Sequence, residues 1–277
     1  MRSLAGRACI NGATTMPYSL VEDVDAASSA GFGAVEIWHR KLIAYLEGHS
    51  AADLRALLRA KGLAVAAICP LMIEYGPDAA KARETIAQAA DVAAELECAT
   101  LLVCLRPTPG RLSTSEALET AAEESARCAD IAAKRGVGLA IEPLGRHPLV
   151  PGPREALSII DMAGRANIGL MVDTFHYYKS EVPLAEIAAL PVEKLRIIHV
   201  NGCEDRPREE LRDAHRLYPT LGVIPAVEML RPLHQRGYSG DFSVEIFREE
   251  YWQQPVDVIT LQAKRYLDQL LAQVAAQ

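Results

Sequence analysis

The sequence lacks the usual marks of a membrane protein, a secreted protein or a nucleic-acid-binding protein. No apolar stretch approaches the roughly 18 residues that span a membrane, and the opening "MRSLAGRACINGATT" has no long apolar segment of the kind found in signal peptides. Basic runs are no longer than three residues, and the net charge is -7. Tight binding to nucleic acid through phosphate neutralisation is therefore not expected, and neither is a membrane partner.

Cysteine pairs of the CxxC type are also missing. Several of the cysteines lie within apolar runs, as buried free thiols do. This distribution predicts a reduced, cytoplasmic protein without a disulfide framework or a cysteine-based metal site. The six cysteines are Cys9, Cys69, Cys98, Cys104, Cys128 and Cys203.

Neither a GxGxxG nor a GxxxxGK[ST] phosphate loop occurs, and no Ser/Gly/Pro-rich linker divides the chain. Eight apolar, β-type runs alternate with Ala-, Leu- and Glu-rich amphipathic segments. Strands that are apolar on both faces indicate a parallel sheet covered by helices, and eight such units close a barrel. A doubly wound open sheet is the alternative, but it usually carries the phosphate loop that is absent here. We therefore predict one α/β domain over residues 1–277, a single (β/α)₈ TIM barrel with eight parallel strands. The expected strands are 7–11, 34–38, 63–69, 99–105, 137–143, 168–173, 195–201 and 242–247.

Helix boundaries are also marked in the sequence. In "SAADLRALLRAKG", Ser50 can cap the start of a helix and Gly62 can end it. Glycines at 31, 136 and 237 likewise precede expected strands.

Four consecutive expected strands carry a carboxylate or an imidazole near their C-terminal ends, at Glu142, Asp173, His199 and Glu245. In a barrel these strand ends converge on the face where active sites lie. Polar strand ends facing solvent are the plainer explanation, but four matching positions in a row favour a shared site. Three carboxylates in one place need a compensating cation. The pattern predicts one divalent ion bound by these four residues, with Mn²⁺ expected first and Mg²⁺, Co²⁺ and Zn²⁺ as alternatives.

The segments around these residues resemble the signatures of the xylose-isomerase-like sugar isomerase and epimerase barrels. They read "IEPLG", "VDTFH", "IIHVNG" and "SVEIFREEYW", and the resemblance extends over essentially the whole chain. The stretches "CINGATT", "LIAYLEGHSAADL" and "GYSGDFSVEIFREEYW" are similar to the inosose (2-keto-myo-inositol) isomerase branch.

The resemblance implies a chemistry. In this family the ion chelates adjacent carbonyl and hydroxyl oxygens of a small sugar or cyclitol and stabilises an enediolate. Glu142 and Glu245 would move the proton as base and acid. His176, from the DxxH motif, and Arg206 resemble the family's contacts to substrate oxygens.

Two residues near the expected site each have two interpretations. Glu36 either supports the site from behind or pairs with Arg40. Arg248, just past Glu245 in the chain, either binds substrate or pairs on the surface with Glu249 or Glu250.

Some positions depart from the family pattern. Pro148 stands where ketose 3-epimerases usually carry a second glutamate, and Gly12 stands where the inosose branch tends to have glutamate. An aspartate pair of that branch is replaced by Asn201 and Gly202. The metal ligands are thus retained while the substrate surroundings differ.

We accordingly expect a metal-dependent isomerase or epimerase of a keto-polyol or sugar. The first alternative is a lyase on the same scaffold, either a dehydratase of inosose or 3-dehydroshikimate or an eliminase of 3-keto-glycosides. An endonuclease-IV-like phosphodiesterase would need more than the seven histidines present. A non-catalytic sugar-binding barrel would not need all four ligands. A homo-oligomer is compatible with the sequence.

Overall fold

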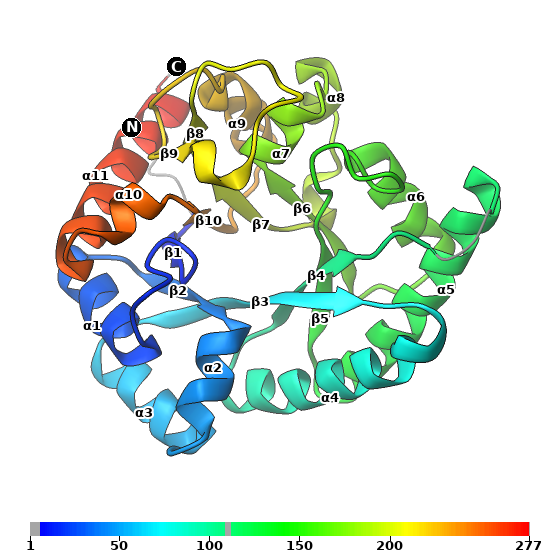
Figure 1. Cartoon of the computed structure of the whole chain (residues 1–277), viewed down its shortest axis with the longest axis horizontal. Coiled ribbons are helices and arrows are strands. Elements are labelled where there is room, and N and C mark those ends of the chain that lie inside the picture. Colours follow the sequence, from blue (N-terminus) through cyan, green and yellow to red (C-terminus); the bar gives the residue numbers. More distant parts are fainter. Residues whose placement is uncertain (1–5, 109–111, 277) are drawn as a thin grey trace.

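The computed structural model describes residues 6–108 and 112–276. Eight strands form a closed barrel in the order β1-β10-β7-β6-β5-β4-β3-β2, with every neighbouring pair parallel (Figure 1). The predicted (β/α)₈ barrel is therefore confirmed. The barrel strands are β1 (Ala8–Asn11), β2 (Ala34–Trp38), β3 (Ala64–Ile73), β4 (Thr100–Leu105), β5 (Gly138–Ile141), β6 (Ile168–Asp173), β7 (Leu195–Val200) and β10 (Asp241–Val244).

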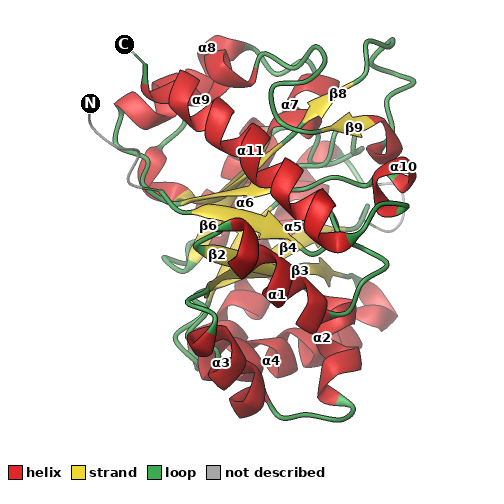
Figure 2. Ribbon diagram, turned by 90° about the vertical axis from the view of Figure 1, so that its left-hand side faces the viewer, coloured by secondary structure: helices red, strands yellow, loops and turns green. Residues whose placement is uncertain are grey.

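Helices surround the barrel and cover the outer faces of its strands (Figures 1 and 2). None of the helices within the described ranges is long and apolar enough to cross a membrane. They are α1 (Leu20–Ala30), α2 (His39–Leu46), α3 (Ala51–Ala60), α4 (Ala79–Glu95), α5 (Thr114–Ala133), α6 (Pro153–Ala163), α7 (Thr174–Lys179), α8 (Leu184–Ala188), α9 (Ala226–Gln235), α10 (Glu249–Trp252) and α11 (Val256–Ala275).

The capping interactions expected for α3 are present in the structure. The Ser50 hydroxyl accepts a hydrogen bond from the backbone N–H of Asp53, whose carboxylate in turn accepts one from the backbone of Ser50. Gly62 follows the helix with a φ of +68°, in the left-handed region that glycine adopts without strain.

The interior of the barrel is filled by small and medium-sized side chains, among them Ala140, Met171 and Ile197. Side chains on a strand alternate between the two faces, so the residue two positions further on also points inward. Glu142, Asp173 and His199 follow these three interior residues by that interval. The strand period therefore delivers them to the mouth of the barrel at its C-terminal end.

The expected strand ends differ from the observed ones by a few residues. Strand β3 continues to Ile73, past the predicted end at 69. Strands β5 and β10 stop at Ile141 and Val244, so Glu142 and Glu245 each lie one residue beyond the regular ladder.

The segment between β7 and α9 holds two short strands that the sequence did not indicate. Strand β8 (Gly202–Cys203) pairs antiparallel with β9 (Arg216–Leu217) and forms a small sheet beside the barrel mouth (Figure 2). This segment supplies a side chain to the site.

Candidate metal centre and active site

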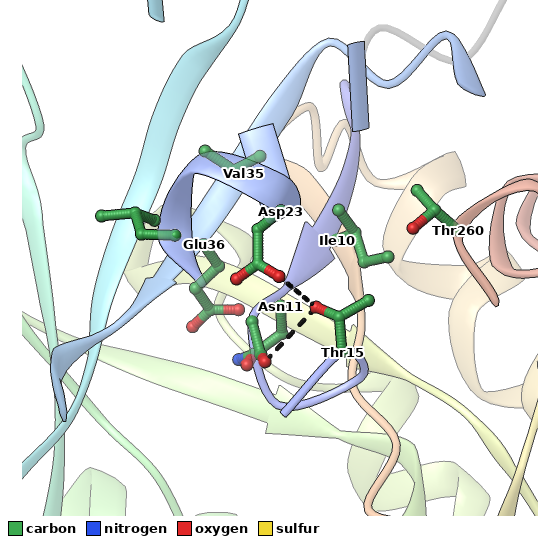
Figure 3. A pocket seen from close by; sticks show the side chains of 9 residues that line it. Ile10, Asn11, Thr15, Asp23, Val35, Glu36 and Thr260 are labelled. Atoms are coloured by element: carbon green, nitrogen blue, oxygen red, sulfur yellow. Dashed lines mark hydrogen bonds between the residues drawn. The ribbon is translucent and has the colours of Figure 1, made fainter. Parts of the chain in front are cut away.

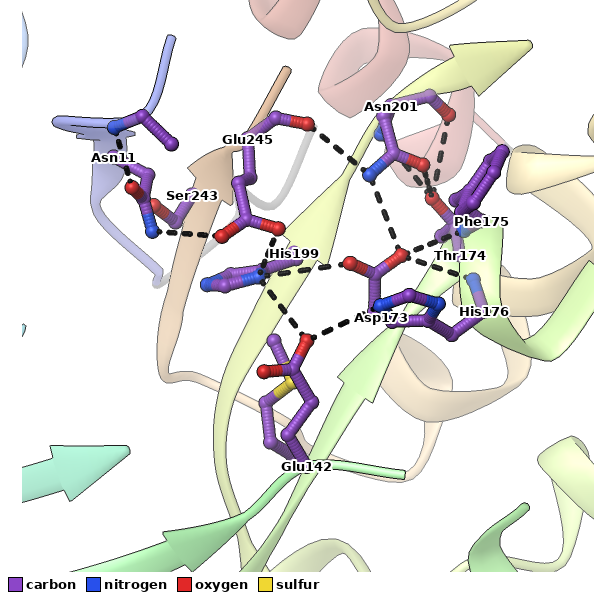
Figure 4. Close-up of polar contacts among 12 residues, drawn as sticks. Asn11, Glu142, Asp173, Thr174, Phe175, His176, His199, Asn201, Ser243 and Glu245 are labelled. Carbon is purple, nitrogen blue, oxygen red and sulfur yellow. Dashed lines mark hydrogen bonds and ion pairs between the residues drawn. The ribbon is translucent and has the colours of Figure 1, made fainter. Parts of the chain in front are cut away.

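The structure brings together the four residues predicted to bind metal. Glu142, Asp173, His199 and Glu245 are all buried, and each offers one ligand atom within 4.8 Å of the others. In Figure 4 they converge from neighbouring strand ends, with Glu142 and Glu245 on opposite sides of the His199 ring.

His199 is oriented by a carboxylate behind it. Its Nε2 lies 2.7 Å from Oε2 of Glu36, which also accepts a hydrogen bond from the Ser243 hydroxyl at 2.8 Å. The Glu36 carboxylate fixes a proton on Nε2, so Nδ1 is the ring nitrogen that remains to face the site. Of the two roles considered for Glu36, the structure contains the contact with His199.

In the part of the chain that the structure describes, the Nδ1 atom of His199 has no hydrogen-bond partner, although it is fully buried. It faces three carboxylate oxygens, at 3.2 Å from Glu245, 3.6 Å from Asp173 and 4.0 Å from Glu142. A buried nitrogen without a partner, surrounded by acceptor oxygens, is the donor arrangement that a divalent cation requires. The residues present therefore fit a metal ion.

Asp173 ends β6 and begins α7 in the same few residues. Its Oδ1 accepts hydrogen bonds from the backbone N–H of Phe175 at 2.7 Å and of His176 at 3.2 Å, as an N-cap does. Burial alone would raise the pKa of this carboxyl, but the positive charge of Arg216 holds the pKa well below its usual range. Asp173 is therefore ionised, with Oδ2 turned toward the site.

The two glutamates are crowded together in a buried space. Burial and the charge of Glu245 raise the pKa of Glu142 to about 8, and burial raises the pKa of Glu245 as well. The Cys104 thiol donates to Oε2 of Glu142 at 3.3 Å, and the Asn11 amide donates to Oε1 of Glu245 at 3.2 Å. Without a cation these two carboxyls resist simultaneous ionisation, and the raised pKa of each makes them candidates for proton transfer.

Arg216, a residue that the sequence did not single out, lies at the centre of the site. It is 1% exposed, and its Nη1 lies 2.7 Å from Oδ2 of Asp173 and 3.2 Å from Oε2 of Glu245. Its Nη2 donates to Nε2 of His176 at 3.1 Å. The guanidinium also lies over the Phe175 ring, 4.6 Å from its centroid. Arg216 thus links two proposed metal ligands to the histidine of the DxxH motif.

The only signal of Arg216 in the sequence was the length of its segment. Residues 201–225 separate β7 from α9, far more than the short connections usual in such barrels, and long connections are commonly functional. An arginine in such a segment is ordinarily exposed, so its burial could not be read from the residue type.

His176 also reaches the site. Its Nε2 lies 3.7 Å from Oε1 of Glu142, while its buried Nδ1 has no hydrogen-bond partner among the described residues. Burial lowers the pKa of His176 to about 4, so the ring is neutral at pH 7. Because Nε2 accepts from Arg216, the proton of the neutral ring lies on Nδ1, and Nε2 is the nitrogen that faces Glu142.

Arg206 and Arg248 occupy a different position, on the acidic side chain of Glu204. The Nε of Arg206 donates to Glu204 at 2.6 Å, and Nη1 of Arg248 donates to it at 2.7 Å. Arg248 also pairs with Glu250 at 3.3 Å, the surface partner considered for it. Both guanidinium groups are engaged by Glu204, and their contact with substrate stays a prediction.

The departures at 201 and 202 have a structural reason. The Asn201 amide donates to Oδ1 of Asp173 and to the backbone carbonyl of Glu245, each at 3.3 Å, and so connects two strand ends. A Cβ on Gly202 would lie 1.9 Å from the carbonyl oxygen of Leu221. Only glycine allows the β7–α9 segment to approach this closely.

Comparison with known proteins gives consistent matches. The family described as xylose isomerase-like TIM barrel matches residues 24–270. The chain is 31% identical to an inosose isomerase of Halalkalibacterium halodurans over 252 residues, 88% of this chain and 89% of that protein. It is 27% identical to a 3-dehydroshikimate dehydratase of Pseudomonas aeruginosa over 84% of this chain, which corresponds to 37% of that protein. A solved structure of IOLI protein with a binding zinc atom superimposes with a TM-score of 0.91 at 24% identity, covering 98% of this chain and 100% of that one.

Proposed function

This chain belongs to the xylose isomerase-like TIM barrel family, and on that premise we propose that it is a divalent-metal-dependent isomerase or epimerase of a keto-polyol or sugar. Its curated relatives carry the names of enzymes, and the chain is an enzyme. The observation that carries the proposal is the convergence of three buried carboxylates on the buried Nδ1 of His199. The similarity to an inosose isomerase supports a cyclitol ketone as the first substrate to test.

Glu142, Asp173, His199 and Glu245 would hold the ion. When bound, a divalent cation supplies a Lewis acid that polarises adjacent carbonyl and hydroxyl oxygens of the substrate. Three of the four donors are carboxylates, which supports Mn²⁺ as the ion to test first. The zinc in the IOLI structure is a reason to test Zn²⁺ beside it.

Proton transfer is assigned to the two glutamates. They lie on opposite sides of the site (Figure 4), and the pKa of each carboxyl is raised, that of Glu142 to about 8. One glutamate would remove the proton from the carbon that bears the hydroxyl. The other would return a proton to the neighbouring carbon for isomerisation, or to the opposite face of the same carbon for epimerisation.

Arg216 and His176 would contact the substrate oxygens of the enediolate, on which negative charge develops. Arg216 is a buried permanent cation, and the neutral ring of His176 lies beside Glu142, with Nε2 at 3.7 Å from Oε1. Both groups are positioned before substrate binds, so little reorganisation is needed as the charge forms. Arg206 and Arg248 are proposed to contact the substrate at the rim of the site. To do so, each guanidinium would have to leave Glu204.

Loss of water is the second candidate reaction. The observation that favours it is the similarity to a 3-dehydroshikimate dehydratase over 84% of the chain. The same first proton transfer would then be followed by departure of a β-hydroxyl group, with the second glutamate protonating it as it leaves. The two reactions differ in whether the substrate offers that leaving group.

The test uses the metal-loaded protein with inososes, ketoses and 3-dehydroshikimate in D₂O. We expect deuterium uptake into product without loss of water, and a loss of turnover of about 10²-fold or more in Glu142→Gln and Glu245→Gln. The exposed Glu119→Gln, on α5, is the matched control and should keep the parent rate. A metallated Gln variant with the parent rate would exclude the two-glutamate mechanism, and release of water from the substrate would assign the protein to the lyases.

A further inference from the structure

A single buried threonine makes hydrogen bonds to the backbone on both sides of Glu245. The Thr14 hydroxyl donates to the carbonyl oxygen of Val244 at 2.8 Å and accepts from the N–H of Ile246 at 3.2 Å. Thr14 is 1% exposed, so water does not replace these bonds if the hydroxyl is removed. The backbone position of Glu245 therefore depends on a residue that follows β1, more than two hundred positions earlier in the sequence.

The same turn holds the Glu245 side chain. Asn11 donates to Oε1 of Glu245 at 3.2 Å, and the orientation of its amide is set by Ala13, whose N–H donates to the Asn11 oxygen at 2.8 Å. With Oε1 held, Oε2 of Glu245 faces Nδ1 of His199 at 3.2 Å. Residues 11–15, "NGATT", which we name the β1 turn, thus fix both the backbone and one oxygen of the glutamate.

The β1 turn is itself anchored by a buried ion pair. The hydroxyl of Thr15 donates to Oδ1 of Asp23 at 2.6 Å, and Lys41 donates to Oδ2 of Asp23 at 2.6 Å and to the carbonyl of Thr15 at 2.8 Å. Asp23 and Lys41 are 7% and 9% exposed and come from α1 and α2. Buried charges of this kind must keep their partners, so the far end of the turn has one stable position.

The turn also has little room to shift. Between it and α1 lies a cavity of about 10 Å³, room for about one water molecule (Figure 3). A Cβ on Gly12 would lie 3.0 Å from Cβ of Trp38 and 3.2 Å from Oδ2 of Asp23. Close packing and hydrogen bonding together leave the turn rigid.

We propose that Thr14 is a positioning residue for Glu245. The Asp23–Lys41 pair anchors the β1 turn and so keeps Thr14 in place. The inference rests on the proposed role of Glu245 as metal ligand and proton-transfer group. Groups that orient metal ligands from behind typically change metal affinity or activity by about 10- to 100-fold when removed.

The test is Thr14→Val, which keeps the shape of the side chain and removes its hydroxyl. We expect Mn²⁺ affinity, measured by calorimetry on the metal-stripped protein, to fall about 10-fold or more, and kcat to fall more than KM rises. Thr14→Ser retains the hydroxyl and should restore both. Thr15→Val, which cuts the link to Asp23, should give a smaller loss in the same direction and serves if Thr14→Val does not fold.

Tyr238→Phe is the matched control, because the Tyr238 hydroxyl is also buried and donates to a carbonyl of β10, that of Asp241 at 3.0 Å, at the opposite end of the strand. It should lower the melting temperature without changing Mn²⁺ affinity. Parent-like affinity in both Thr14→Val and Thr15→Val would overturn the proposal, and so would an equal loss of affinity in Tyr238→Phe. Weakened Mn²⁺ binding in Thr14→Val, with no isomerase, epimerase or lyase activity in the parent, would leave the positioning role standing and refute the proposed function.

Discussion

Glu142 illustrates how, at the scale of single residues, burial converts an ordinary carboxylate into a group that titrates near neutral pH. Its pKa rises from an ordinary 4.5 to about 8 because the side chain is buried and because Glu245 lies across the site. The negative charges of Glu245 and Glu36 raise the pKa of His199 well above its ordinary value, against the lowering effect of burial. A metal-free site therefore carries protons that a bound ion must displace.

We predict that Mn²⁺ affinity rises as the pH increases from 6.5 to 8.5 and that binding releases protons. Between its ordinary pKa and about 8, Glu142 binds more protons in the folded state than in the unfolded state, and His199 shifts in the same direction. The metal-free protein should therefore lose folding stability as the pH rises from 7 to 8.5, by at most about 1.4 kcal/mol per pH unit for each proton.

Calorimetry in two buffers of different ionisation enthalpy measures the released protons, and urea unfolding of the stripped protein measures the stability. Glu142→Gln should release fewer protons than the parent. An affinity that stays constant between pH 6.5 and 8.5 would contradict the prediction.

At the scale of elements, the segment between β7 and α9 determines whether Arg216 reaches the barrel mouth. The carbonyl of Cys203, in β8, accepts a hydrogen bond from the N–H of Val223 at 3.1 Å, which folds the segment back on itself. Gly222 makes this possible, because its φ is +76° and a Cβ there would lie 1.7 Å from the Cys203 oxygen. The close approach of two backbones is thus a condition for the position of Arg216.

We predict that Gly222→Ala reduces turnover by about 10-fold or more, because displacement of β8 and β9 moves Arg216 away from Asp173. Gly62→Ala is the control, since Gly62 also has a positive φ but a Cβ there would have no atom of the described residues within 4 Å. It should cost about 1–2 kcal/mol of stability through backbone strain alone and leave turnover unchanged. Steady-state kinetics with urea unfolding of both variants checks this, and equal kinetic effects would show that the close approach is unimportant.

For the whole molecule, the closed barrel buries every one of the six cysteines as a free thiol. Cys98, Cys128 and Cys203 lie in different parts of the fold, and burial raises the pKa of each to about 12. The reactive thiolate form is therefore scarce in all three, and access for a reagent is closed as well.

We predict that Ellman's reagent at pH 8 modifies none of the thiols of the native protein within minutes and modifies six after unfolding in urea. The reason is that reaction requires global or large local opening of the barrel. A thiol that reacts rapidly in the native state would contradict this picture, and mass spectrometry of the labelled peptide would identify it.

Local pattern alone predicted the barrel and its four convergent residues. Apolar runs of strand length and helix-capping residues such as Ser50 depend on neighbours within a few positions, and the alternation of the chain marked eight strands. The strand period then carried Glu142, Asp173 and His199 to one face, because a parallel barrel aligns all of its strand ends. These features follow from short-range geometry repeated along the chain.

Closure of the barrel settled the remaining features of the site, because it joins residues that no local pattern connects. Barrel closure places Glu36 beside His199, where the sequence had left two possible partners for this glutamate. It also buries Arg216 between Asp173 and Glu245 and brings Thr14 against β10. Each of these contacts links separate elements of the barrel, and each involves a polar residue type that is usually exposed. Their burial is favourable only when all the partners are in place, so they emerge from the assembled barrel and not from any one segment.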